Sequence, residues 1–491
     1  MSDAARQGVD AVRHIETHIS HIFLIGDHAY KMKKAVRLDF VDFSTLAARA
    51  RACREELVVN GRTAPDIYLS VEAVTRGPGG LRLGGTGEAV EHLVKMRRFE
   101  QDAILDRIVA EGRLTPDVAR AVADAAAGLH LSAARAEPGE AEPFARTVGD
   151  LGERLVRAAA GTPLVDEAAR WRDMAQADVA ARAPRLAARA RRGAVRHGHG
   201  DLHLRNICLF RGEVRLFDAI EFEPRFSHID VLYDLAFLLM DLKHRDTDAA
   251  ATAILSRYLA ATRDYRGVED LRLFVSTRAA VRALVSLLSP EPDDKAEAAE
   301  YLSLAAEALS RRPRPALIAV GGRSGTGKST LAAALAPILA PAPNVVSIRS
   351  DEARKRMFGL APEARLPVSA YVSDVGARVY RRILRDAARA LRGGAVVALD
   401  AAFLEDDRRA AAEDVAKAAG APFVGLWLSA PDAVLEARVA ARRGDASDAD
   451  VAVLRRQKEP EALGRWTRLD AYAPLDRLVG EARSALARLD G

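Results

Sequence analysis

Hydrophobic residues follow two different periods in the first 310 residues. Short apolar runs separated by polar turns occupy residues 19–74, among them HIFLIG at 21–26 and DIYLSVEAV at 66–74, and this spacing is typical of β-strands. From residue 115 to residue 194 the chain is rich in Ala, Leu and Arg, and its apolar residues recur with helical spacing. The pattern predicts an α+β region with two lobes, a small β-rich lobe at about 15–100 and a larger helical lobe at about 101–310.

The last third of the chain has a different pattern. Apolar runs at 317–320, 345–348, 396–399 and 423–428 alternate with longer helical stretches, as in an α/β fold with a parallel sheet. The segment SRRPRP at 310–315 precedes the first of these runs and suits a linker, because proline fixes its own φ and lacks an N–H donor. We therefore expect a first domain at residues 1–310, a linker at 311–315 and a second domain at 316–491.

Length and composition agree with this division and exclude several protein classes. A chain of 491 residues is too long for one core, and 49% apolar with 29% charged residues excludes wholesale disorder. The N-terminus has no apolar signal segment, and LAFLLM at 235–240 is too short to span a bilayer, so we expect a cytoplasmic protein without a membrane partner. Cys53 and Cys208 form no C-x-x-C pair and are expected to be buried thiols. The net charge of +5 permits nucleic-acid binding but does not indicate it.

The second domain opens with a phosphate-binding pattern. GGRSGTGKST at 321–330 contains G-x-x-x-x-G-K-[ST] between a predicted strand and a predicted helix. Glycines let backbone N–H groups turn towards phosphate oxygens, the lysine reaches the β- and γ-phosphates, and the next hydroxyl binds Mg²⁺. The expected nucleotide-binding residues are Gly322, Gly325, Thr326, Gly327, Lys328, Ser329 and Thr330, with Lys328 also catalytic and Ser329 also a metal ligand.

Later elements of this domain carry further charged groups. Asp351 follows the run NVVSIRS and is placed to accept a proton from an acceptor hydroxyl or to orient that hydroxyl. It could also cap the next helix, and the two roles are compatible. Asp400 ends the run AVVALD, where a carboxylate binds the magnesium shell. Arg438 and Arg442 lie one helical turn apart and could close over the transferring phosphoryl group, or face solvent.

These motifs resemble the small P-loop kinase family that includes polynucleotide kinases, gluconate kinases, chloramphenicol phosphotransferase and the zeta toxins. The resemblance covers residues 316–470 and rests on GGRSGTGKST, IRSDEARKRM, VVALDAAF and RVAARRGDASDAD. It implies that Asp351 is the catalytic carboxylate and that Arg354 contacts the acceptor or a phosphate. It also implies that Arg438 and Arg442 are lid arginines.

A second constellation lies in the first domain, in HGHGDLHLRNICLFRGEVRLFDAIEF at 197–222. The spacing from His199 through Asp201 to Asn206 is that of a protein-kinase-like catalytic loop, and Asp218 follows the next predicted strand. In this chemistry Asp201 orients the acceptor hydroxyl and takes up its proton, while Asn206 and Asp218 hold Mg²⁺.

Such a site also needs a lysine on a small-lobe strand and a carboxylate on a helix to hold it. The run HIFLIGDHAYKMKKAV and the predicted helix RACREELVVN offer these groups. Our first choice is Lys31 with Glu56, and Lys33 and Glu55 remain rivals. Both pairs could instead be exposed surface charges.

The residues of the first domain resemble the aminoglycoside phosphotransferase family, within the protein-kinase-like fold, from about Thr17 to Leu309. HGDLHLRN matches its catalytic motif, and LFDAIEFEPRFSHIDVLYDLAFLLMDL matches its metal-binding strand and the following helix. The resemblance implies an ATP site between lobes, a hinge at residues 94–99 and a small-molecule acceptor with a hydroxyl group. Asp230 and Asp234 are assigned structural roles, and the small lobe lacks a G-x-G-x-x-G loop. The domain order resembles bacterial two-domain phosphotransferase/ATP-binding proteins.

The sequence thus predicts a bifunctional kinase with ATP and Mg²⁺ at two sites. It would transfer the γ-phosphoryl group to hydroxyl acceptors, which we expect to be small molecules. In one alternative, the first domain is a nucleotide-binding regulatory module that controls the second. In another, the second domain phosphorylates nucleic-acid 5′-hydroxyls, with Arg354, Lys355 and Arg356 at the start of a basic channel.

Overall fold

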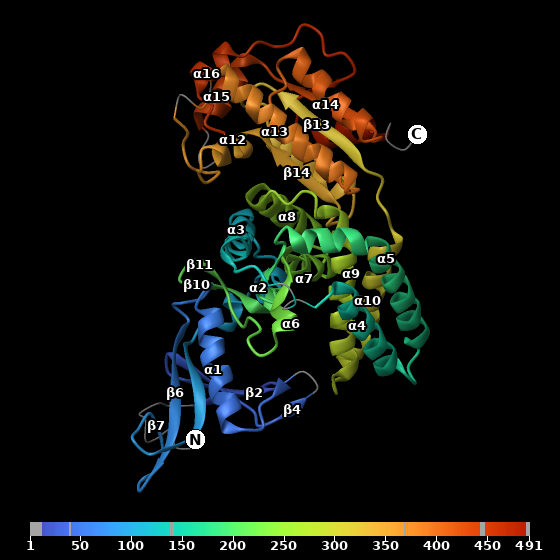
Figure 1. Ribbon diagram of the computed structural model, residues 1–491. Helices are drawn as coiled ribbons and strands as arrows, with labels where there is room; N and C mark the ends of the chain where they lie inside the picture. Colours follow the sequence, from blue (N-terminus) through green and yellow to red (C-terminus); the bar gives the residue numbers. More distant parts are fainter. Residues whose placement is uncertain are drawn as a thin grey trace. The chain divides into compact units, whose positions relative to one another are not determined.

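The computed structural model describes residues 12–38, 41–137, 139, 142–367, 370, 372–441 and 447–487 (Figure 1). They fold into two compact units, one from residues of 1–150 and 183–241, the other from residues of 151–182 and 242–491. Three helices contribute residues to both units: α4 (Phe144–Ala159), α5 (Val165–Arg191) and α7 (Val231–His244). The domain boundary expected at residues 311–315 stays a prediction. These five residues have no regular secondary structure and join α10 (Pro292–Ser310) to β13 (Ala316–Gly322).

The first unit begins with an antiparallel sheet, in which the strands lie in the order β1–β2–β3–β8–β6–β7. Their bounds are β1 (Arg13–Glu16), β2 (Ser20–Ile25), β3 (His28–Lys33), β6 (Tyr68–Gly77), β7 (Gly80–Leu83) and β8 (Glu88–Arg97). The short strands β4 (Arg37–Leu38) and β5 (Val41–Asp42) pair separately. Helix α1 (Leu46–Asn60) packs against β8 and β6, and the Thr45 hydroxyl caps it by accepting the Ala48 N–H.

The remaining elements of the first unit are mostly helical, with two short two-stranded sheets. They are η2 (Gln101–Ala103), α2 (Leu105–Ala110), α3 (Pro116–Ser132), β9 (Val195–His197), η3 (Leu204–Asn206), β10 (Ile207–Phe210), β11 (Glu213–Leu216), α6 (Pro224–Ser227) and β12 (His228–Asp230). β10 pairs with β11, and β9 with β12, all antiparallel. Thr115 caps the start of α3, because its hydroxyl accepts the Val118 N–H. Pro116 follows at the first helical position, where the N–H that proline lacks would have no partner within the helix.

Both cysteines lie in one buried cluster of the first unit. Cys53 on α1 and Cys208 on β10 pack with Ile67, Val94 and other apolar side chains. Burial raises the pKa of each thiol to about 12, so neither is a thiolate at neutral pH.

The second unit contains a five-stranded parallel sheet in the order β14–β15–β13–β16–β17. Its other strands are β14 (Val345–Arg349), β15 (Val396–Asp400), β16 (Phe423–Ser429) and β17 (Thr467–Asp470). The helices are α8 (Asp248–Thr262), α9 (Val268–Leu288), α10, α11 (Lys328–Leu339), α12 (Ser350–Met357), α13 (Ser373–Arg392), α14 (Asp406–Ala418), α15 (Asp432–Ala441), α16 (Val451–Arg456) and α17 (Leu475–Leu486).

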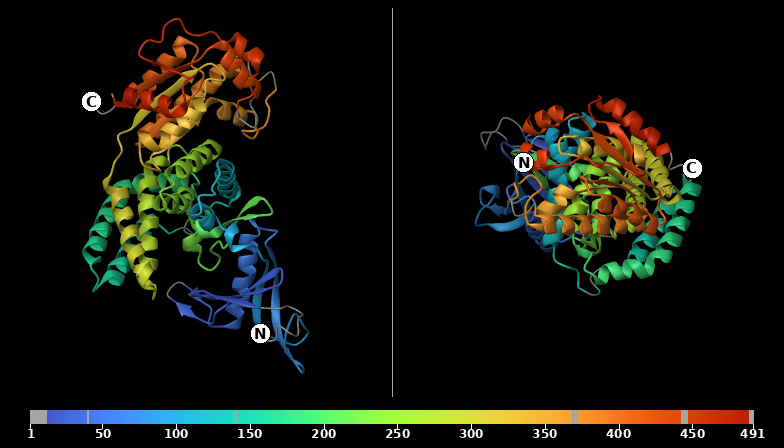
Figure 2. Two further views of the ribbon diagram at one scale, coloured as in Figure 1. Left: turned by 180° about the vertical axis from the view of Figure 1, so that it is seen from behind. Right: turned by 90° about the horizontal axis from the view of Figure 1, so that it is seen from above.

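Helices flank this sheet on both sides (Figure 2). Ile318 and Val320 of β13 pack in one buried cluster with residues of α11 and α17, including Leu331 and Ala482. Helices α13 and α14 pack against each other and against strands of the sheet. Because parallel strands are buried on both faces, their continuous apolar runs could be recognised in the sequence.

Helix α8 closes the β14 edge of the sheet. The Ser256 hydroxyl accepts the Ser347 N–H of β14 at 2.9 Å, and the Asp248 carboxylate accepts the Ala342 N–H at 3.0 Å. The first bond satisfies a backbone donor that the edge strand would otherwise expose, and the second holds the segment before β14 against α8. Residues 242–310 therefore belong to the same compact unit as the parallel sheet, although they come before that sheet in the chain.

The expected fold class is confirmed. An α+β region with an antiparallel sheet precedes an α/β region with a parallel sheet. None of the helices within the described residues is long and apolar enough to cross a membrane.

Candidate functional site

The phosphate-binding loop joins β13 to α11, and its glycines are required by backbone geometry. Gly322 has φ +141°, and a Cβ placed there would lie 2.6 Å from the Leu428 carbonyl oxygen. Gly325 has φ +86°, and its Cβ would lie 2.9 Å from the Leu435 carbonyl oxygen. The Lys328 ammonium donates to the Arg323 carbonyl oxygen at 3.0 Å, across the loop. The chain is thus folded into the tight turn that a phosphate cradle needs.

Two expected metal ligands meet beside this loop. The Ser329 hydroxyl donates to Asp400 Oδ2 at 2.5 Å, at the end of β15. Arg349, the last residue of β14, donates to the Ser329 hydroxyl at 2.9 Å and to Asp400 Oδ2 at 3.3 Å. The Arg349 guanidinium therefore lies next to both the Ser329 hydroxyl and the Asp400 carboxylate. These two oxygen ligands fit Mg²⁺, which is held by few protein oxygens together with phosphates.

A cavity of about 600 Å³ opens beside the loop, and Asp351, Arg354 and Arg438 line it together with loop residues. Asp351 lies in the first turn of α12, whose N-cap is Arg349, so the alternative in which Asp351 caps this helix is wrong. Arg354 donates to the Ala370 carbonyl oxygen at 2.8 Å, and Arg438 donates to the Ala471 carbonyl oxygen at 2.9 Å. Arg442 lies outside the described residues.

The cavity also contains residues that the sequence analysis missed. Tyr380 of α13 lines it with Arg408 of α14, whose guanidinium carbon lies 4.3 Å from the tyrosine ring centroid. The Tyr380 hydroxyl accepts the Phe403 N–H at 2.8 Å, which fixes the ring. Gln457 accepts the Ser324 N–H of the loop at 2.7 Å. Arg349 could have been found from its place at a strand end, whereas Tyr380, Arg408 and Gln457 belong to no local motif.

In the first unit, the structure brings Lys31, Glu56 and Asp218 together. The Lys31 ammonium on β3 lies 2.8 Å from Glu56 Oε1 on α1 and 2.5 Å from Asp218 Oδ1. Burial opposes charge on Lys31, but the carboxylates of Asp218 and Glu56 outweigh it and raise the lysine pKa. The Lys31 side chain is therefore positively charged at neutral pH. It lies between the Glu56 carboxylate and Asp218, which is an expected metal ligand.

A second lysine joins this cluster. The Lys33 ammonium, also on β3, lies 2.6 Å from Glu56 Oε2 and forms an ion pair with Glu221. Burial would raise the pKa of Glu56, but the charges of Lys31 and Lys33 lower it well below its usual range. Glu55, the preceding residue of α1, is exposed. The sequence left the choice between Glu55 and Glu56 open. In the structure, Glu56 contacts both candidate lysines.

The loop after β9 holds Asp201 and Asn206 against each other. The Asn206 amide donates to the backbone carbonyl oxygen of Asp201 and to its Oδ2, each at 2.9 Å. Asp234 on α7 accepts the N–H groups of His199 at 2.6 Å and Gly200 at 3.0 Å, and these bonds tie the loop to the helix. The amide nitrogen of Asn206 is used in these bonds, so its oxygen is the atom suited to a metal.

Asp218 occupies a strained backbone position two residues after β11. Its φ is +61°, a left-handed conformation that few non-glycine residues adopt. The Ala219 N–H donates to the Asn60 side-chain oxygen at 2.8 Å, and the Asp218 N–H donates to the Tyr68 hydroxyl at 3.1 Å. These bonds aim the Asp218 carboxylate at Lys31. Asp230 has a different task, since it forms two bonds with Arg189, each at 2.8 Å.

The segment expected to be the hinge consists of the last residues of β8 and the two residues after it. Met96 and Phe99 pack against the cluster that contains Cys53 and Cys208. β1 and β2 are joined by a tight turn at residues 17–19. In this turn the Ser20 N–H donates to the Thr17 hydroxyl at 3.0 Å.

Comparison with known proteins covers both units. The AAA domain family matches residues 317–460. The protein Rv2004c of Mycobacterium tuberculosis and the protein Mb2027c of Mycobacterium bovis are each 30% identical over 485 residues, covering 95% of this chain and 94% of theirs. The chain belongs to the same family as these mycobacterial proteins. Because the match covers 95% of this chain, it includes most of both units.

Solved structures resemble separate parts of this family member. A gluconokinase from Sinorhizobium meliloti 1021 is 24% identical, with a TM-score of 0.27, over 36% of this chain and 95% of its own. A choline kinase from Cryptosporidium parvum Iowa II is 12% identical, with a TM-score of 0.42, over 61% of this chain and 88% of its own. The residues that match the AAA domain family include the P-loop at 321–330.

Lys33→Met should lower the free energy of unfolding by about 3–5 kcal/mol, because it leaves the buried Glu56 and Glu221 carboxylates with one cationic partner fewer. Urea denaturation followed by circular dichroism measures this loss. Lys34→Met is the matched control, since Lys34 pairs with the exposed Glu16 and should change stability little. Equal losses in the two variants would contradict the network.

Gly322→Ala should weaken ATP binding at the P-loop about 10- to 100-fold, because the new methyl group meets the Leu428 carbonyl oxygen and backbone strain of this kind costs ~1–3 kcal/mol. Titration with a fluorescent ATP analogue measures the change. Gly480→Ala serves as control, because Gly480 lies within α17 and a Cβ there meets nothing within 4 Å. Unchanged affinity in Gly322→Ala would show that the loop tolerates a side chain.

Proposed function

We propose that this protein is an ATP- and Mg²⁺-dependent phosphotransferase with two nucleotide sites, one in each unit. Each site would transfer the γ-phosphoryl group of ATP to the hydroxyl group of a small molecule. The observation that carries the two-site proposal is Lys31, which forms ion pairs with both Glu56 and Asp218 in the first unit, far along the chain from the P-loop.

At the first site, the residues divide the work of phosphoryl transfer. Lys31 supplies positive charge for the nucleotide phosphates, and Glu56 holds the lysine in place. Asp218 and the side-chain oxygen of Asn206 are the groups that would hold Mg²⁺, which supplies charge neutralisation between the phosphates. Asp201 accepts the proton of the acceptor hydroxyl as the new O–P bond forms and the bond between the γ-phosphorus and the β-bridging oxygen breaks.

At the second site, the loop N–H groups and Lys328 bind the phosphates, and Ser329 with Asp400 would hold Mg²⁺. Asp351 takes the proton of the acceptor hydroxyl, and ADP leaves with the bridging oxygen. Arg438 lies on the same cavity as Asp351 and balances the charge that accumulates on the transferring group. A cavity of about 600 Å³ supports a small-molecule acceptor, since small-molecule sites occupy a few hundred to a thousand Å³.

The regulatory alternative for the first unit explains its geometry less well. A module that only binds nucleotide needs no carboxylate near the acceptor, yet Asp201 is held in a defined position by Asn206. It also needs no strained residue, yet Asp218 is held at φ +61°. Strain of this kind is maintained at sites where side-chain position matters for chemistry.

The test is a screen of a metabolite extract with full-length protein, ATP and Mg²⁺. We expect new species heavier by one phosphoryl group, detected by mass spectrometry and absent when Asp201→Ala and Lys328→Ala are combined. Isotopic labelling of the ATP γ-phosphate identifies the source of the group. If the wild-type protein produces no labelled species from extracts, nucleic-acid 5′ ends or the protein itself, the proposal fails.

A further inference from the structure

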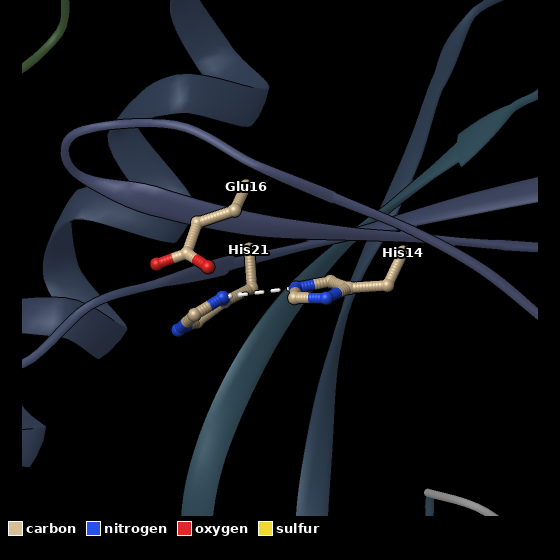
Figure 3. A group of neighbouring side chains, drawn as sticks. All are labelled: His14, Glu16 and His21. Atoms are coloured by element: carbon tan, nitrogen blue, oxygen red, sulfur yellow. Dashed lines mark hydrogen bonds between the residues drawn. The ribbon is translucent and has the colours of Figure 1, made fainter.

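The hairpin of β1 and β2 carries three potential metal ligands on one face. Glu16 lies directly opposite His21 in the register, and His14 precedes Glu16 by two residues, so all three side chains leave the sheet on the same side. His14 Nε2 lies 3.0 Å from His21 Nδ1, and the ligand atoms of the three residues all lie within 4.8 Å of one another (Figure 3). Within the described residues, this is the one group of three such ligands that lies so close together.

The nitrogen atoms of His14 and His21 are about as far apart as two imidazole nitrogens that bind the same metal ion. Two nitrogen ligands about 2.0–2.1 Å from a tetrahedral Zn²⁺ ion lie about 3.3 Å apart, close to the 3.0 Å separation of His14 Nε2 and His21 Nδ1. The His14 ring stacks on Phe23, with centroids 4.9 Å apart and planes 15° from parallel, which holds its orientation. Imidazole nitrogens with one carboxylate oxygen are ligands typical of Zn²⁺ sites that keep a position open for water.

We propose that His14, Glu16 and His21 bind a divalent transition-metal ion of the Zn²⁺ class. Without metal, one imidazole must donate its N–H to the other, as the 3.0 Å contact indicates. On binding, that ring carries its proton on the distal nitrogen, and both facing lone pairs point at the ion. The ion replaces two hydrogen bonds, the one between the two rings and the one from Lys34 to Glu16, with three coordination bonds.

Glu16 is available as a ligand, although it has a partner in the structure. The Lys34 ammonium lies 2.6 Å from Glu16 Oε1, so the carboxylate forms an ion pair at the surface. Glu16 is exposed, so the exchange of Lys34 for a divalent cation does not bury an unpaired charge.

The ion would be separate from the proposed nucleotide site. His21 and Ile22 are neighbours on β2, so their side chains leave opposite faces of the sheet, and Ile22 pairs with Lys31. The three ligands thus occupy the face opposite Lys31. The ion would clamp β1 to β2 next to the turn that joins them. The inference does not depend on the proposed function.

The test uses the full-length protein without an affinity tag, in excess Mg²⁺ and without nucleotide, so that the oxygen-rich sites do not take up Zn²⁺. Titration with Zn²⁺ against a competing chelator should show one ion per chain. His14→Ala and His21→Ala should each weaken binding by more than about 10-fold, because loss of supporting contacts alone costs 10- to 100-fold. His18→Ala is the matched control, since His18 is exposed in the adjacent turn and outside the group.

A second measurement is the melting temperature. Zn²⁺ should raise it in the wild type and in His18→Ala, but not in His21→Ala. Glu16→Gln keeps the shape of the side chain and should weaken binding without altering the fold, which separates loss of a ligand from loss of structure. If the wild type binds no Zn²⁺, or if His14→Ala and His21→Ala bind it as tightly as the wild type does, the site does not exist.

Discussion

Lys328→Ala is expected to lower phosphoryl transfer at the P-loop site by about 10²–10³-fold, the usual cost of removing one charge-stabilising donor from a transition state. Lys328 begins α11, and its ammonium contacts the Arg323 carbonyl oxygen across the loop, within reach of the phosphates that the loop would bind. Its loss removes a positive charge from the β- and γ-phosphates, where negative charge builds up during transfer. Nucleotide titration should show two ATP molecules per wild-type chain and one per Lys328→Ala chain.

The control for this variant is Lys417→Ala. Lys417 lies exposed in the last turn of α14 and does not line the cavity. Its substitution by alanine removes the same charge from the chain as Lys328→Ala does. It should leave nucleotide stoichiometry and turnover unchanged. If Lys328→Ala still binds two nucleotides and keeps all phosphoryl-transfer activity, the P-loop is not a catalytic site in this protein.

Asp201→Asn should lower transfer at the first site by about 10²–10⁴-fold, the range expected for loss of a general base. The amide keeps the size of the carboxylate, so the loop geometry held by Asp234 should survive. It cannot take up the proton of the acceptor hydroxyl at neutral pH. Nucleotide binding should persist, because Lys31, Glu56 and Asp218 are untouched, so turnover falls while the ATP dissociation constant stays near its wild-type value.

Asp173→Asn is the control, since Asp173 is exposed on α5 and belongs to neither site. Products that disappear in Asp201→Asn but remain in Lys328→Ala belong to the first site. ATP binding to the first site, together with a product spectrum that Asp201→Asn leaves unaltered, would favour a regulatory module. The two substitutions together thus separate a double kinase from a kinase with a nucleotide-sensing domain.

The P-loop shows how much can be predicted when chemistry is contiguous in sequence. Gly322, Gly325 and Lys328 lie within seven residues, and the strand and helix on either side follow from local hydrophobic periods. The conformations at Gly322 and Gly325 are ones that a glycine adopts without strain. The loop from His199 to Asn206 could be predicted for the same reason, because its motif is also contiguous in the sequence.

The choice of the lysine and carboxylate partners could not be made from sequence. Lys31 and Lys33 both face the same side of β3, because side chains alternate along a strand. Glu55 and Glu56 differ only by a rotation of about 100° around α1, since a helix has about 3.6 residues per turn. Only the packing of α1 on β8 and β6 decides that Glu56 turns inward, and that one carboxylate contacts both lysines.

The sequence by itself determined the two fold classes, their order and the local motifs, because these depend on residues close together in the chain. The tertiary structure alone decided which distant side chains meet. Arg349 contacts Ser329 and Asp400, Tyr380 and Arg408 share the cavity, and His14 meets His21 across a hairpin. Such contacts depend on strand register, helix rotation and the order of strands in a sheet. Burial of apolar surface over the whole domain sets these, and no short stretch of sequence encodes them.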